Sequence, residues 1–101
     1  MNNKNRKINP NSEMYKAILQ LKDTDECFRF FQDLCTVPEL NAMEQRFEVA
    51  RLLDKGLIYT DILEQTGASS ATISRVNRSL HYGQDGYRIV IERLASEDKA
   101  E

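Results

Sequence analysis

The chain has 101 residues, and its 14 Lys and Arg nearly balance its 16 Asp and Glu, which leaves a formal net charge of -2. This length predicts a single domain, and a hydrophobic content of 41% excludes a disordered chain. A net charge so close to zero supplies no global attraction to nucleic acid, so any DNA-binding signal has to be local. No stretch has the apolar length of a membrane span or the hydrophobic core of a signal peptide, and we expect a cytoplasmic protein.

The two ends of the chain are polar. Residues 1–11 read as a flexible basic arm that could reach phosphate or the minor groove. Its basic residues are Lys4, Arg6 and Lys7. Residues 96–101 read as a frayed polar tail, which leaves one helical domain over residues 12–95.

Two helices are expected in the first third of that domain. Ser12 can cap a helix that continues to about Lys22, and Thr24 is the next candidate cap. The second helix carries an unusual number of apolar side chains, namely Cys27, Phe28, Phe30, Phe31 and Leu34. Because these residues surround much of a short helix, we expect it to be sandwiched between other helices. Cys27 and Cys35 have no partners that would complete a zinc site, so they are predicted to be buried, reduced thiols.

A third, longer helix is predicted to begin at the capping box Thr36-Val37-Pro38-Glu39 and to end at Gly56. Its expected apolar positions recur at steps of three and four residues and are Leu40, Met43, Phe47, Ala50 and Leu53. A sixth helix is expected after Gly86 and carries Tyr87, Val90, Ile91 and Leu94. No strand pattern occurs, so the fold class is all-α with six helices.

The region from about residue 59 to 80 has the spacing of a helix-turn-helix motif. Short helices over 59–66 and 70–80 flank Gly67, whose left-handed conformation lets the chain reverse within a few residues. Ile73, Val76 and Leu80 would pack the second helix onto the first. The remaining face is small, hydrogen-bonding and then basic, as a helix entering the major groove requires. Its residues are Ser70, Ala71, Thr72, Ser74, Arg75 and Arg78, and Lys55 is expected close to phosphates.

The same spacing also fits a plain helical hairpin whose polar face is solvated, and the distribution of charge argues against that reading. Between residues 67 and 91 the sequence has three arginines and one acid, whereas residues 23–48 carry seven acids and two arginines.

The sequence gives little support to an enzyme, because His81 has no neighbouring Ser or Cys nucleophile. We expect the His81 side chain to meet phosphate or water. The alternative that stays open is an adaptor that binds another protein and does not bind DNA specifically.

These motifs resemble the Trp repressor superfamily, and in detail its TrpR-like YerC/YecD branch of regulators. The resemblance spans about residues 34–94, and the run Ala71-Thr72-Ile73-Ser74-Arg75 is its most specific part. It implies a transcription regulator that acts as a repressor on double-stranded DNA and works as an intertwined homodimer through the N-terminal helices.

The resemblance also implies an effector pocket. In that family two arginines flank the indole of bound tryptophan, and the matching residues here are Arg46 and Arg75, with Ser79 and Thr36 at further pocket positions. Val76 stands where the family has glycine, and its branched side chain would crowd an indole. We therefore expect any effector to be a small anion and not L-tryptophan. Ion pairs between the two arginines and Glu44, Glu48 or Asp61 are the alternative.

Overall fold

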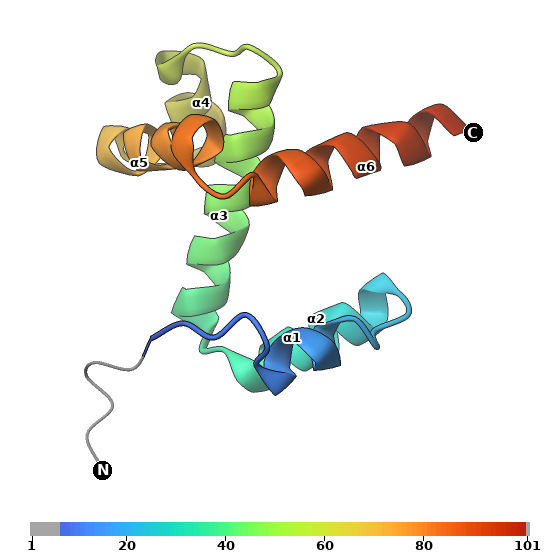
Figure 1. Cartoon of the computed structure of the whole chain (residues 1–101). Helices are drawn as coiled ribbons and strands as arrows, with labels where there is room; N and C mark the ends of the chain where they lie inside the picture. Colours follow the sequence, from blue (N-terminus) through green and yellow to red (C-terminus); the bar gives the residue numbers. More distant parts are fainter. Residues whose placement is uncertain (1–6, 101) are drawn as a thin grey trace. The chain divides into compact units, whose positions relative to one another are not determined.

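The computed structural model describes residues 7–100, with Ala100 as backbone only, and within this range it contains six helices and no strand (Figure 1). The helices are α1 Glu13–Ile18, α2 Thr24–Leu34, α3 Val37–Asp54, α4 Tyr59–Thr66, α5 Ser70–Tyr82 and α6 Gly86–Ala100. The all-α fold with six helices is confirmed. None of the described helices is long and apolar enough to cross a membrane. The chain divides into two compact units, Met1–Val37 and Pro38–Glu101.

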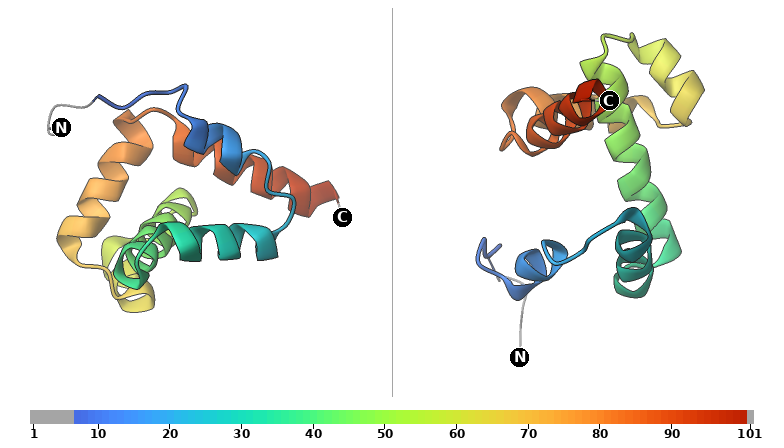
Figure 2. Two further views of the ribbon diagram at one scale, coloured as in Figure 1. Left: turned by 90° about the horizontal axis from the view of Figure 1, so that it is seen from below. Right: turned by 90° about the vertical axis from the view of Figure 1, so that its right-hand side faces the viewer.

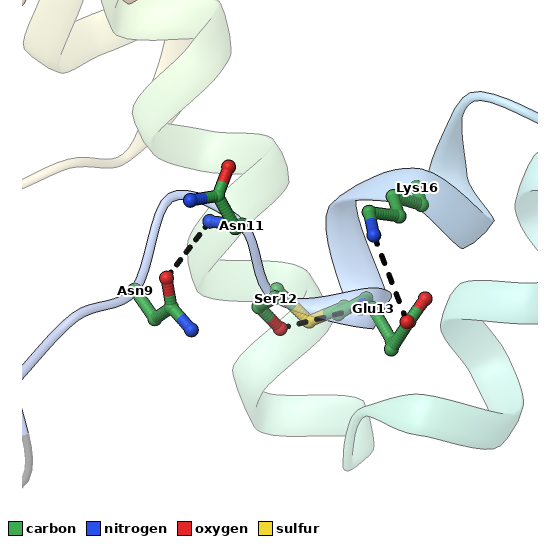
Figure 3. A network of polar contacts seen from close by, with 6 residues as sticks. Asn9, Asn11, Ser12, Glu13 and Lys16 are labelled. Carbon is green, nitrogen blue, oxygen red and sulfur yellow. Dashed lines mark hydrogen bonds and ion pairs between the residues drawn. The ribbon is translucent and has the colours of Figure 1, made fainter.

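In the first unit, α1 begins where Ser12 predicts it. The Ser12 hydroxyl accepts a hydrogen bond from the backbone N–H of Met14 at 3.2 Å, and Asn9 Oδ1 accepts one from the N–H of Asn11 at 2.9 Å (Figure 3). One helical turn later Lys16 pairs with Glu13 at 3.7 Å. These short-range contacts shape the start of the helix.

The predicted end of α1 and the predicted start of α2 are both displaced. Instead of continuing to about Lys22, α1 ends at Ile18, because the N–H groups of Gln20 and Leu21 bond to carbonyls three residues back, which tightens the chain into turns. The cap of α2 is Asp23 and not Thr24. Its carboxylate accepts from the N–H of Glu26 at 2.8 Å, and Thr24 is already the first helical residue.

The apolar residues of α1 and α2 are not buried within the described chain. Phe28 remains 53% exposed and Leu34 50% exposed. Phe30 and Phe31 are half-buried, and their rings pack edge to face with centroids 5.4 Å apart. The expectation that the two cysteines are buried is wrong for Cys27, which is exposed; Cys35 is half-buried, and both are free thiols.

The second unit is built on α3. The helix starts directly after Thr36, as the capping box predicts, and ends in a Schellman motif. Gly56 takes a φ of 90°, its N–H bonds to the Leu53 carbonyl at 3.0 Å, and the N–H of Leu57 bonds to the Leu52 carbonyl at 3.1 Å. The predicted stop at Gly56 is confirmed.

A single apolar cluster forms the core of this unit. Its buried residues are Val49, Ala50, Leu52, Ile62, Ala68, Ile73 and Val76, with Leu53, Leu57, Tyr87 and Ile91 packed against them. On α3 only Ala50 of the five predicted apolar positions is fully buried, and Met43 is exposed. The face of α3 that packs is therefore rotated toward Val49 and Leu52, because α4 and α5 supply the residues that cover it.

Within the second unit, α4 and α5 lie beside the C-terminal half of α3, and α6 runs outward from the end of α5 (Figures 1 and 2). The α4 helix has the predicted bounds, whereas α5 continues two residues beyond the expected Leu80. The α6 helix continues to Ala100 and so includes residues that were expected to form a frayed tail. Its side chains from Ser96 to Lys99 are exposed, as polar residues on a solvated last turn would be.

Candidate nucleic-acid interface

The turn of the predicted helix-turn-helix is fixed by Gly67 and Thr66. Gly67 takes a φ of 72° and its N–H bonds to the Leu63 carbonyl at 2.9 Å, which closes α4. The Thr66 hydroxyl donates to the Ile62 carbonyl at 2.7 Å and accepts from the N–H of Ala68 at 3.1 Å. The positive φ favours glycine, so the turn forms where the sequence places it.

A tether from α3 holds this turn in place. Gln45 Nε2 donates to the carbonyl oxygen of Thr66 at 3.1 Å, a contact between residues 21 positions apart. The sequence does not predict this role for Gln45, because a glutamine on a long helix is ordinarily solvated. No local signal identifies this contact.

Helix α5 starts on a cap, Ser69, that the sequence analysis does not predict. Ser69 Oγ accepts from the N–H of Thr72 at 3.1 Å and donates to Thr72 Oγ1, also at 3.1 Å. The pair of serines after Gly67 was the available signal, since serine is among the preferred N-cap residues. The cap leaves the hydroxyl hydrogen of Thr72 free to donate elsewhere.

The two faces of α5 separate as predicted. Ile73, Val76 and Leu80 are buried against the core. The predicted DNA-facing residues that are exposed are Ser70, Ala71, Ser74, Arg75 and Arg78, and Thr72 is half-buried at the start of the same helix. Small and hydroxyl-bearing side chains thus precede two arginines on the open side of one helix.

The outlying basic residues are placed differently. Lys55 is exposed at the C-terminal end of α3 and lines a hollow of about 480 Å³ with Arg51, Asp54 and Leu94. Lys7 is exposed in the first unit. Lys4 and Arg6 lie outside the described residues.

Arg88, one of the three arginines in the basic segment, has a structural role. Its Nε donates to the Leu80 carbonyl at 3.2 Å, and its Nη2 lies 3.1 Å from Nδ1 of His81. A guanidinium at this point satisfies a free carbonyl at the C-terminal end of α5 and interacts favourably with the helix dipole. The Nδ1 atom of His81 therefore lies against Arg88, while the expectation that this side chain meets phosphate or water stays a prediction for the rest of its exposed ring.

The four predicted effector-pocket residues are divided between the two units. Arg46 is half-buried on α3, whereas Arg75 and Ser79 are exposed one turn apart on α5. Ser79 lines a hollow of about 400 Å³ at the junction of α5 and α6. Thr36 belongs to the first unit.

Two observations bear on what such a pocket could hold. In the part of the chain that the structure describes, neither Arg46 nor Arg75 forms an ion pair, and Glu48 bonds instead to Arg51 at 2.8 Å. Val76 is only 1% exposed and belongs to the core cluster with Val49 and Ala50. Its side chain therefore fills space between α3 and α5, where a smaller residue would leave room.

Two short helices joined by a left-handed glycine turn, with an exposed basic face on the second, define a helix-turn-helix protein. The chain belongs to the Trp repressor family, a family of DNA-binding regulators, since the family model described as Trp repressor protein matches residues 11–95.

Individual relatives agree with this assignment. The chain is 51% identical over 82 residues to YerC of Bacillus subtilis (strain 168), covering 81% of this chain and 79% of YerC. The crystal structure of a TrpR like protein from Eubacterium eligens ATCC 27750 superimposes with a TM-score of 0.79 at 58% identity, over 82% of this chain and 86% of that one. A second structure, from Staphylococcus aureus, gives a TM-score of 0.79 at 46% identity, over 82% and 83%.

Proposed function

We propose that this protein is a cytoplasmic, sequence-specific DNA-binding transcription regulator, acting as a repressor, that inserts α5 into the major groove. The observation that carries the proposal is the division of α5 into a buried apolar face and an exposed face of small, hydroxyl and arginine side chains. Membership of the Trp repressor family supports it. The protein acts by binding and not by catalysis.

Base edges are read by the first turns of α5. Ser74 is exposed and its hydroxyl forms no hydrogen bond with any residue that the structure describes, so this hydroxyl can donate or accept at a base edge. Ala71 permits close approach, and Thr72 contributes its remaining donor. Arg78, farther along α5, and Lys55, just after the end of α3, contact phosphates.

The protein acts as a homodimer, in which the apolar residues of α2 supply an interface. Phe28 and Leu34 are about half exposed in the single chain, and burying such side chains is the main driving force for association. A two-fold dimer presents two α5 helices to half-sites one helical turn apart, about 34 Å along B-DNA. The bound site is accordingly expected to be an inverted repeat.

An effector, where one acts, is a small anion held between Arg46 and Arg75. Neither guanidinium is neutralised by an acid among the described residues, and a carboxylate or phosphate would satisfy both. Because Val76 already fills core space, L-tryptophan does not fit.

The test is a selection of bound fragments from random duplex DNA, followed by titrations of point variants on the selected site. Arg78→Ala should weaken binding to every sequence alike and reduce the salt slope by about one, whereas Ser74→Ala should change preference at one or two base pairs. Arg93→Ala, which removes an exposed arginine from α6, is the matched control and should leave affinity unchanged.

The adaptor alternative makes the opposite prediction. If no site is selected and Arg75→Ala and Arg78→Ala bind random DNA as the wild type does, the protein is not a specific DNA binder.

A further inference from the structure

Three side chains form a straight stripe along α5. Arg75, Arg78 and Tyr82 follow one another at steps of three and four residues, which places them within about 60° of one another around the helix axis. The buried residues Ile73 and Val76 lie on the opposite side. Arg78 and Tyr82 therefore face away from the core of the unit, and Arg75 lies at the edge of the stripe.

Tyr82 is the aromatic residue of this stripe. Its side chain is 86% exposed, and its hydroxyl forms no hydrogen bond with any residue that the structure describes. Gly83 ends the helix immediately afterwards, and a Cβ at Gly83 would overlap the carbonyl oxygen of Ser79. The chain can turn away here only because this residue is glycine, and the turn leaves Tyr82 uncovered.

The last turn of α5 is nevertheless held firmly. The Arg88 guanidinium bonds to the Leu80 carbonyl and to His81, and the His81 ring lies 6.4 Å from the ring of Tyr82. Tyr82 therefore extends from an anchored turn, so a contact made by its hydroxyl would cost little additional ordering of the backbone.

We infer that Tyr82 is a further DNA contact, which donates its hydroxyl to a backbone phosphate beside the phosphate held by Arg78. The inference rests on the proposed function. The stripe from Arg75 to Tyr82 covers about 10.5 Å at 1.5 Å per residue, more than the depth of the major groove, which is about 8.5 Å. A helix whose first turns reach base edges therefore brings Tyr82 to the level of the phosphates. A tyrosine hydroxyl is one of the side-chain donors that contact phosphate oxygens, and two arginines on the same stripe favour an anionic partner.

The test compares Tyr82→Phe, which removes only the hydroxyl, with Tyr15→Phe, the same change on α1 in the other unit. Affinity for the selected duplex is measured by titration at several salt concentrations. We expect Tyr82→Phe to bind about tenfold more weakly, with an unchanged salt slope because a neutral donor releases no counterion. Tyr15→Phe should bind as the wild type does.

The failures of the two proposals are distinguishable. If Arg78→Ala weakens binding and Tyr82→Phe does not, the Tyr82 contact is refuted and the DNA-binding function stands. If neither variant changes affinity, the proposed function fails as well. A lower melting temperature or altered subunit association in Tyr82→Phe would also overturn the inference, because it would assign the hydroxyl to the protein's own structure.

Discussion

The two units of this chain differ in how they treat their apolar residues. Among the residues that the structure describes, all the buried hydrophobic ones lie in the Pro38–Glu101 unit, where α3, α4 and α5 share one core. In the described part of the Met1–Val37 unit no residue of α1 or α2 is buried, although α2 has a clear apolar face. The second unit has a core of its own, whereas α2 in the first leaves Phe28 and Leu34 about half exposed.

This difference shows what each unit contributes. The second unit supplies a rigid helix-turn-helix whose geometry rests on contacts within itself, such as the bond from Gln45 to Thr66. The first unit has exposed apolar side chains on α2, and none of the residues of α1 or α2 is buried. If the dimer forms through α2, the stability of the first unit depends on protein concentration and that of the second does not.

The largest effect is expected from Phe31→Asp. A carboxylate placed beside Phe30 in the apolar face of α2 would be desolvated in any dimer, so the dimer should be lost and stability should fall by more than about 3 kcal/mol. Light scattering and circular dichroism at micromolar concentration measure both. A variant that remains dimeric with the melting temperature of the wild type would remove α2 from the interface.

The next test places the same substitution in each unit. Leu52→Ala removes a side chain that is 6% exposed in the core, and should cost about 2 to 5 kcal/mol at every protein concentration. Leu34→Ala removes one that is half exposed on α2, and should act mainly through dimer dissociation, with an effect that grows on dilution. Denaturant titrations at two protein concentrations give both results. Equal costs that do not depend on concentration would mean that the two units differ less than their burial indicates.

A smaller change in stability, with a functional readout, is expected from Val76→Gly. Losing a buried side chain and introducing glycine within α5 should cost about 2 to 4 kcal/mol. The variant should also gain room for a flat ring between α3 and α5. Calorimetry with L-tryptophan and a panel of small acids compares it with the wild type. Micromolar tryptophan binding by the wild type would show that Val76 does not close the pocket.

The smallest effects are expected at the two helix caps, one in each unit. Asp23→Ala removes the cap of α2 and Ser69→Ala that of α5, and each should cost about 1 kcal/mol. Only Ser69→Ala should also weaken DNA binding, since it loosens the first turn of the recognition helix. Thermal melts and DNA titrations of both variants decide this, and equal losses of affinity would place α2 at the DNA as well.

The sequence by itself determined the features that depend on a few neighbouring residues. Gly56 and Gly67 stop helices because only glycine takes a positive φ without strain, and Ser12 caps α1 through its own hydroxyl. The bounds of α4, the helix-turn-helix spacing and the family resemblance could also be predicted from the sequence. The sequence did not predict which of two neighbouring residues, Asp23 or Thr24, caps α2.

Only the tertiary structure decided which faces are buried and which cations are free. Val49 and Leu52 are in the core and Met43 is exposed because α4 and α5 cover one side of α3, and the spacing of apolar residues along α3 does not reveal that side. Arg88 is one of the three arginines of the basic segment, yet it holds the end of α5 because the turn at Gly83 brings α6 back to Leu80. Capping and turn formation are local in sequence, whereas burial and pairing depend on which distant segments meet.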